Sequence, residues 1–143
     1  MPKTGRFKYE KLIKYPHMDK EDIITWEIYI DTHPSAYDSV DYDYALGQVP
    51  EHAAIADEGG TSGTERVNKY RIDVIGYKGE EVHLIELKKR ATPAILGHLR
   101  AEKLLYDRDE ANGAKTTMFV IAREATPELD MLAAADNITL ILV

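Results

Sequence analysis

Two apolar runs, residues 70–77 and 82–88, constrain this chain most strongly. Both are rich in β-branched and aromatic residues, which suit a pleated and half-buried surface. Gly79 lies between them, where a tight reversal of the chain needs a residue that tolerates positive φ. The pattern predicts a β-hairpin. With the turn centred between Gly79 and Glu80, Asp73 lies opposite Glu86.

This pairing places two acids on one face of the hairpin. Carboxylates on directly opposed strand positions repel each other and require a compensating cation. Lys88 shares the face of Glu86, because strand side chains alternate with a period of two. A divalent ion such as Mg²⁺ is the stronger candidate, and the chemistry that it implies is phosphodiester hydrolysis. The residues alone leave a metal site and a buried structural ion pair equally open.

Both faces of the predicted hairpin are apolar, which is typical of a central position in a sheet covered on both sides. One face is formed by Ile72, Val74, Ile85 and Leu87, and the other, around the acids, by Ile75, Val82 and Leu84. Charged groups at such positions are seldom buried unless they are paired or bound to metal. The acids therefore call for a functional explanation.

The length of 143 residues suits one domain, which we expect to span residues 19–143 behind a basic N-terminal arm of residues 1–18. The chain contains no cysteine, which excludes disulfides, thiolate zinc sites and cysteine nucleophiles. No run is long and apolar enough for a membrane span, and the N-terminus lacks a secretory signal. We therefore expect a cytoplasmic protein that is not secreted and does not enter a membrane.

The net charge of −7 is unevenly distributed along the chain. The arm is basic, residues 19–65 are strongly acidic, and residues 66–143 are balanced. Within the last part, basic residues gather after the paired acids, and they include Lys88, Lys89, Arg90 and Arg100. This cluster is read either as a nucleic-acid contact or as a solvated helix face. An acidic chain is expected to bind DNA weakly or to be recruited by a protein partner.

The remaining pattern predicts an alternation of helices and strands. Helices are expected at 19–31 (capped by Asp19), 94–106 and 126–135, and strands at 39–47 (tyrosines and aspartates on opposing faces), 116–122 and 138–143, with a loop at 49–66. Together with the hairpin, the order is helix, three strands, helix, strand, helix, strand. This order indicates an α/β (α+β) fold, a mixed β-sheet flanked by helices.

Asp73 and the run Glu86-Leu87-Lys88 resemble the signature of the PD-(D/E)XK nuclease superfamily, and the chain is similar to its small phage-encoded members. The likeness covers residues 19–143 and implies a restriction-endonuclease-like αβββαβ core with an extra helix and strand. Ile72 replaces a proline of the family pattern. Where one branch has Gln-x-x-x-Tyr on the helix after the hairpin, this chain has His98-x-x-x-Glu102 or Glu102-x-x-x-Tyr106.

The resemblance implies roles for particular residues. Asp73, Glu86 and the backbone carbonyl of Leu87 would ligate Mg²⁺ or Mn²⁺, and Lys88 would orient the attacking water and stabilise developing charge. Further candidates are Glu27 for the metal site and Lys89, Arg90, Arg100 and His98 for contacts with nucleic acid.

Two functions follow from these roles. The first is a metal-dependent deoxyribonuclease that acts on DNA, as a monomer or a homodimer. The alternative is an inactive protein of nuclease fold that serves as an assembly or interaction module, for instance in a virus particle.

Overall fold

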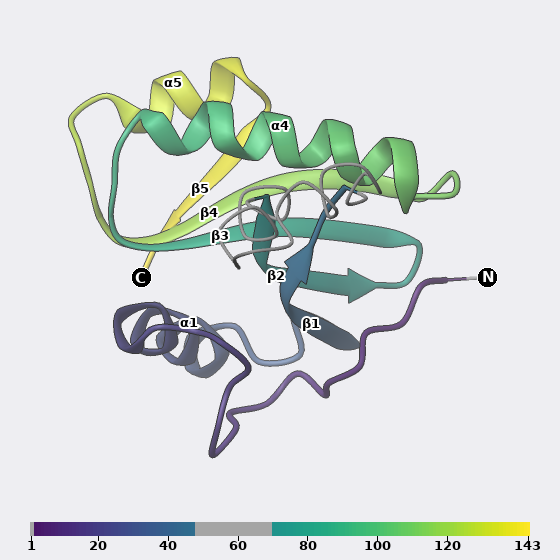
Figure 1. The fold of residues 1–143 in the computed structure, drawn as a ribbon. Helices are drawn as coiled ribbons and strands as arrows, with labels where there is room; N and C mark the ends of the chain where they lie inside the picture. Colours follow the sequence, from purple (N-terminus) through teal and green to yellow (C-terminus); the bar gives the residue numbers. More distant parts are fainter. Residues whose placement is uncertain (1, 48–69) are drawn as a thin grey trace, which may run out of the picture.

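The computed structural model describes residues 2–47 and 70–143, and the predicted loop at 49–66 lies outside these residues. The order of elements agrees with the prediction (Figure 1). The helices are α1 (Lys20–Thr32), α4 (Ala94–Asp109) and α5 (Leu129–Ala135), and the strands are β1 (Ser39–Ala45), β2 (Arg71–Lys78), β3 (Glu81–Ala91), β4 (Lys115–Ala125) and β5 (Ile138–Leu142).

The five strands form one mixed sheet in the order β1-β2-β3-β4-β5. Strands β1, β2 and β3 pair antiparallel, whereas β3, β4 and β5 pair parallel. Parallel neighbours need a long crossover, and α4 and α5 supply the two crossovers. The predicted fold class, a mixed sheet flanked by helices, is confirmed.

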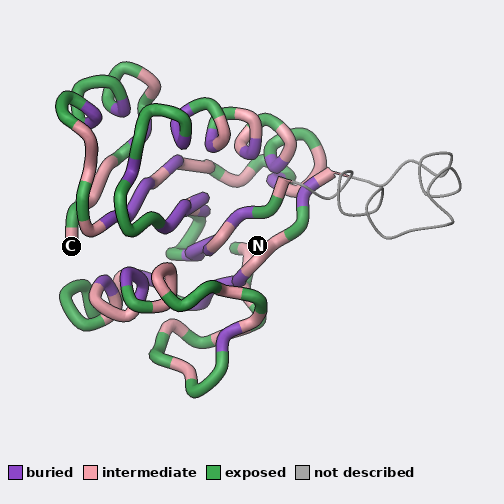
Figure 2. Tube along the Cα trace, turned by 60° about the vertical axis from the view of Figure 1, so that its left-hand side comes forward, coloured by how far each residue is buried: buried purple, intermediate pink, exposed green. Residues whose placement is uncertain are grey.

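The sheet lies between two helical layers. Figure 1 shows α4 and α5 on one side and α1, with the N-terminal segment, on the other. The α4-side cluster of buried residues includes Leu84, Leu99 and Tyr106, and the α1-side cluster includes Trp26 and Leu87. Buried positions accordingly follow the sheet and the inner faces of the helices (Figure 2). Each face of the sheet has its own apolar core.

The helices begin where capping and apolar spacing predict. Asp19 Oδ1 accepts a hydrogen bond of 2.9 Å from the amide of Asp22, which caps α1. Trp26 is fully buried, and its Nε1 donates to the Tyr42 hydroxyl at 3.0 Å. None of the helices in the described ranges has the length and apolarity that crossing a membrane requires.

The hairpin has the predicted register. Tyr77 pairs with Val82 and Val74 pairs with Ile85, as expected for a turn centred between Gly79 and Glu80. Gly79 has a φ of +57°, the left-handed conformation that two-residue hairpin turns demand. The turn therefore determines which residues of the two strands face each other.

One predicted face is wrong. Ile72 was expected beside Val74, but it lies in the α4-side cluster while Val74 lies in the α1-side cluster. The neighbouring strand shows the same switch, since Tyr42 belongs to the α1-side cluster and Tyr44 packs against the α4-side cluster. The predicted single tyrosine face of β1 is therefore also wrong. Asp43, between the two tyrosines, has a φ of +49°, which interrupts the regular alternation of a strand.

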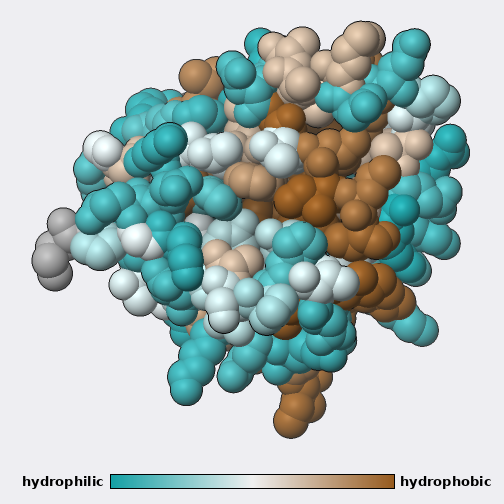
Figure 3. Space-filling view, turned by 180° about the vertical axis from the view of Figure 1, so that it is seen from behind, coloured by the Kyte–Doolittle hydropathy of each residue, from teal (hydrophilic) through white to brown (hydrophobic). Residues whose placement is uncertain are grey.

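The two edges of the sheet differ. Phe7 of the N-terminal segment forms an antiparallel bridge with Val40 of β1, and Tyr15 of the same segment is buried. Strand β5 forms the other edge and has no second strand beside it among the described residues. Leu142 in β5 is 57% exposed, and Figure 3 shows apolar side chains gathered on the rear face of the molecule. An uncovered apolar edge strand is a surface on which another chain can pair.

Replacing Gly76 with alanine should destabilise the fold. A Cβ atom there would lie 2.4 Å from the ring of Tyr37, which is held by a 2.9 Å hydrogen bond between its hydroxyl and His83 Nδ1. We expect Gly76→Ala to lower the free energy of unfolding by about 1–3 kcal/mol in urea denaturation. Gly97→Ala is the control: nothing lies within 4 Å of its Cβ position in α4, and the helix should gain roughly 0.5–1 kcal/mol. Equal stability changes would contradict the packing seen at Gly76.

Candidate metal and phosphate site

Asp73 lies where β2 and β3 stop pairing with each other. The last backbone pair of the hairpin on this side is Val74 with Ile85. One residue further, Asp73 Oδ2 accepts a hydrogen bond of 2.9 Å from the Leu87 amide. The carboxylate thus binds an amide that a strand would otherwise pair. This bond holds Asp73 beside the centre of β3 and also satisfies a buried donor.

Glu86 lies on the α4 side of the sheet, following Val82 and Leu84 along β3. It is only 4% exposed, and its Oε1 has no hydrogen-bond partner in the described part of the chain. Its carboxyl group contacts those of two other acids, Asp73 and Glu102. A buried carboxyl with an unpartnered oxygen carries a desolvation cost, which a proton or a cation can relieve.

Helix α4 brings Glu102 and His98 to the same point. These residues lie one helical turn apart, and His98 Nε2 is 2.7 Å from Glu102 Oε2. Glu102 is fully buried, and its Oε1 also has no partner among the described residues. The His98 side chain is 40% exposed, and its ring stacks on Tyr70 with centroids 6.0 Å apart. The histidine therefore lies between the buried acids and the surface.

The acids hold protons to unusually high pH. Burial, followed by the charge of Asp73 and side-chain contacts with Asp73 and Glu102, raises the pKa of Glu86 well above its ordinary value. Burial likewise raises the pKa of Glu102 to about 8, although its contact with Glu86 acts in the opposite direction. Because the two carboxyl groups contact each other, they titrate as a pair and not as independent acids.

Lys88 and Arg90 lie on the part of β3 that extends beyond its pairing with β2. Both are exposed, and both line a pocket of about 310 Å³ with Glu86, His98 and the first turn of α4. The positive charge of Lys88 lowers the pKa of Glu102, which places the ammonium within electrostatic reach of the buried acids. The lining of the pocket therefore combines one buried acid, Glu86, with two exposed cations.

Helix α1 brings Asp22 within electrostatic reach of Asp73, whereas the predicted Glu27 contacts Tyr15. Burial, then the charges of Asp73 and Asp19, raise the pKa of Asp22 to about 7, whereas Lys88 lowers it. Glu27 instead accepts a hydrogen bond of 2.7 Å from the Tyr15 hydroxyl. Nothing in the described residues links Glu27 to the acids of the hairpin. Asp22 is in the first turn of α1, where an acid is favoured by the helix dipole. Its presence in the sequence therefore gives no sign of a functional role.

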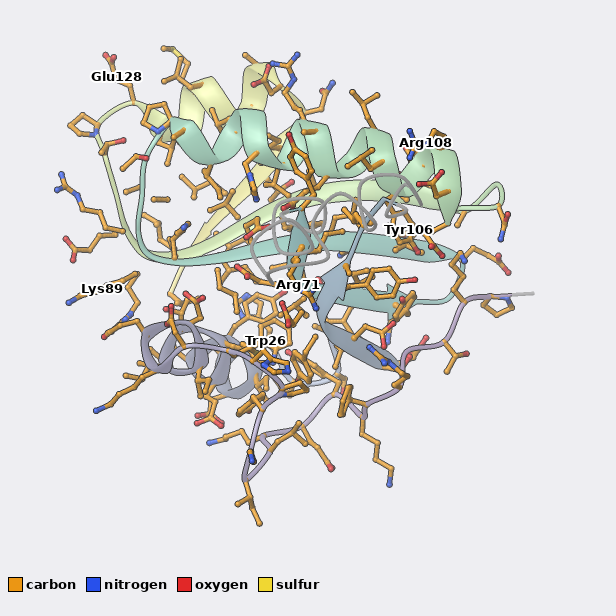
Figure 4. All side chains as sticks on the ribbon, in the orientation of Figure 1. Trp26, Arg71, Lys89, Tyr106, Arg108 and Glu128 are labelled. Carbon is orange, nitrogen blue, oxygen red and sulfur yellow. The ribbon has the colours of Figure 1, made fainter. Side chains whose placement is uncertain are left out.

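Two predicted nucleic-acid residues lie apart from the pocket. Lys89 points to the α1 side of the sheet, where its charge acts on Glu21 (Figure 4). Arg100 lines a separate hollow on α4 together with Lys103 and Leu104. The structure thus gathers Asp73, Glu86, Lys88, Arg90 and His98 and separates them from Glu27, Lys89 and Arg100. The backbone of Leu87 lies at the centre of the group, and its carbonyl stays a predicted ligand.

The buried acid Glu102 was not among the predicted site residues, although the sequence contains a signal for it. The buried residues of α4 are Ile95, Leu96, Leu99, Glu102 and Tyr106, so one acid lies among apolar positions at helical spacing. An acid in such a stripe is rare without a partner. Only the packing of α4 over β3 shows that the partner is Glu86.

This group of residues fits a divalent cation. Glu86, His98 and Glu102 each offer one ligand atom, and these atoms all lie within 4.8 Å of one another. Two of the ligand groups are buried carboxyls with unpartnered oxygens, the donors that hard cations prefer. A dication would neutralise charges that protons neutralise otherwise.

Comparison with known proteins yields no match for this chain, whether to a protein-family model, a curated protein or a solved structure. The candidate site therefore stands on the geometry of its own residues.

The paired acids should make the stability of the metal-free protein depend on pH. An unfolded glutamate ionises near pH 4.5, whereas Glu102 in the folded protein holds its proton to about pH 8. The folded state binds more protons across this window, so stability is highest below it and falls as pH rises through it. We expect a loss on the order of a few kcal/mol between pH 5 and about 8, measured by urea denaturation in EDTA.

Glu102→Gln should reduce this pH dependence, because glutamine is neutral throughout the range, while the contributions of Glu86 and Asp22 persist. Glu124→Gln, an exposed position in β4, is the matched control and should keep the slope of the parent protein. An unchanged slope in Glu102→Gln would show that Glu102 ionises normally.

Proposed function

We propose that this protein hydrolyses phosphodiester bonds of DNA in a divalent-metal-dependent reaction, as a nuclease of the PD-(D/E)XK type. One observation carries the proposal: Asp73, Glu86 and Glu102 converge at the open end of a hairpin, beside a pocket lined by Lys88. Buried acids with unpartnered oxygens support a cation site, and exposed cations beside them support an anionic substrate.

Asp73, Glu86 and Glu102 are the carboxyl groups that would hold Mg²⁺ or Mn²⁺. When bound, such an ion lowers the pKa of a water molecule and offsets the negative charge of the phosphate. The fold holds these carboxyl groups in position, since Asp73 accepts a hydrogen bond from the Leu87 amide and Glu102 lies in helix α4. Rigid ligands reduce the reorganisation that binding and reaction would otherwise need.

Lys88 acts on the substrate side of these acids. Its ammonium donates hydrogen bonds to the attacking water or to a phosphate oxygen and stabilises negative charge as it develops. Arg90 lines the same pocket wall, where its planar guanidinium can bind two phosphate oxygens at once. The pair thus orients a phosphodiester against the carboxyl groups.

The net charge of the chain affects how the protein associates with DNA. A net charge of −7 opposes long-range attraction to a polyanion, so binding rests on the local cations of the pocket. We therefore propose weak intrinsic affinity for DNA, with a protein partner that brings the nuclease to its substrate. Such binding falls steeply as salt is added.

The second candidate is an assembly module, and the uncovered edge at β5 favours it. Around this edge Leu142, Met131 and Leu132 are exposed by 57%, 61% and 39%. Pairing of two β5 strands in a homodimer, or of β5 with another protein, would cover this surface. Of the two candidates, only the first needs the acids and Lys88.

Substitutions in the pocket separate the two candidates. We expect Lys88→Ala to reduce cleavage of plasmid DNA in Mn²⁺ by at least about 100-fold, because it removes a group that acts on water and phosphate. Its rise in melting temperature with Mn²⁺ should persist, since the amine is not a metal ligand. Glu86→Ala should lose both cleavage and the metal-dependent rise.

Lys89→Ala is the matched control for Lys88→Ala. It removes the same charge from the next residue, but on the α1 side of the sheet, and should retain most of the cleavage rate. Wild-type protein that leaves supercoiled, linear and single-stranded DNA intact with Mn²⁺ at low salt would refute the nuclease proposal. Formation of a stable oligomer under those conditions would then support the assembly module.

A further inference from the structure

The donor atoms that α4 contributes differ in kind from those of the hairpin. The hairpin offers oxygen donors, whereas α4 adds the imidazole nitrogen of His98 beside the carboxylate of Glu102. We propose that His98 and Glu102 complete a mixed nitrogen and oxygen site that selects a first-row transition-metal dication, such as Mn²⁺, over Mg²⁺. This inference rests on the proposed function only in sharing the Glu86 carboxylate.

The geometry brings the imidazole to the acids. His98 Nε2 is 2.7 Å from Glu102 Oε2, and ligand atoms of His98, Glu86 and Glu102 lie within 4.8 Å of one another. The three side chains come from two elements, β3 and α4, that pack against each other. A cation placed among them would exchange the present contacts between the side chains for bonds to itself.

The three residues differ in burial, so that one side of the site is open to solvent and the other is closed. Glu102 is fully buried and Glu86 nearly so, while His98 is 40% exposed and lines the pocket with Lys88. The ring of Tyr70, which is partly buried, stacks on the imidazole and supports its orientation. An ion entering the pocket therefore meets the imidazole at the rim and the carboxylates beneath it.

A structural ion pair explains these contacts less well. A helical His–Glu pair spaced by four residues contributes only a few tenths of a kcal/mol, far less than the cost of burying a carboxylate. Glu102 Oε1 and Glu86 Oε1 both lack partners in the described part of the chain, so His98 does not satisfy the pair. Two unsatisfied buried acids beside one imidazole are better explained by a ligand set that awaits a dication.

The donor set determines which dication is preferred. Mg²⁺ demands oxygen ligands in near-ideal octahedral geometry and keeps several of its waters. Imidazole nitrogen suits the divalent transition metals, whose affinity for nitrogen and oxygen sites rises along the first row from Mn²⁺. Replacing one oxygen ligand by His98 therefore favours a transition metal without excluding weak binding of Mg²⁺.

Titration calorimetry on the full-length, metal-free protein tests this selectivity. We expect wild type to bind Mn²⁺ at least about 10-fold more tightly than Mg²⁺. His98→Gln should weaken Mn²⁺ binding by about 10-fold or more and change Mg²⁺ binding little, so that the preference collapses. His83→Gln is the matched control, because His83 also lies beside a glutamate, with Nε2 3.3 Å from Glu81 Oε1, but outside the pocket.

Pulsed electron paramagnetic resonance on the Mn²⁺-loaded protein gives a readout independent of activity. A directly bound imidazole should produce ¹⁴N coupling to Mn²⁺ in wild type and in His83→Gln, and the coupling should vanish in His98→Gln. Mn²⁺ bound by wild type without ¹⁴N coupling would overturn the inference, even if the His98 variant failed to fold. The inference would also be overturned if folded His98→Gln preferred Mn²⁺ over Mg²⁺ by the same factor as wild type.

The two proposals fail in different ways. If the protein shows the coupling and the Mn²⁺ preference but cuts no DNA, the proposed metal site stands and the proposed nuclease function fails. If the protein cuts DNA equally well with either ion and shows no ¹⁴N coupling, the proposed nuclease function stands and the proposed role of His98 fails.

Discussion

The contact between Glu86 and Glu102 is the constraint on which the site depends. Two carboxyl groups are buried against each other between β3 and α4, with Asp73 as a third acid nearby. Burying such groups costs several kcal/mol for each ion unless protons, hydrogen bonds or a cation compensate. The surrounding apolar packing of Leu84, Leu99 and their neighbours offsets this cost. The fold thus maintains an electrostatically unfavourable site, which is typical of functional centres.

The topology of the sheet explains why the site forms at this point. Strand β3 is paired on both sides near the hairpin turn, but beyond Ile85 its pairing continues only with β4. Beyond the last pair of β2 and β3, the Asp73 side chain accepts a hydrogen bond from the Leu87 amide, and Lys88, Lys89 and Arg90 are exposed. A strand held firmly on one side and free on the other can present side chains to a substrate without losing its own geometry.

Sequence reasoning succeeded where contacts are local and failed where they are distant. The hairpin register follows from the turn at Gly79, because each residue of a hairpin is related to its partner by the turn alone. The face of Ile72 could not be read in this way, since it depends on the break in alternation near Asp43 on another strand. The sequence did not single out Asp22 for a related reason: helical spacing does not reveal which turn of α1 lies nearest the hairpin.

The sequence by itself determined the order of elements, the class of the sheet and the register of the hairpin, whose last pair, Val74 with Ile85, lies next to Asp73 and Glu86. These features follow from periodicity and from a two-residue turn, which act over short stretches of chain. Only the tertiary structure decided that Glu102 and His98 meet Glu86, and that Lys89 and Arg100 lie away from Lys88. Those relations depend on how α4 and α1 pack across the sheet, and packing of distant elements reflects the whole core rather than any local pattern.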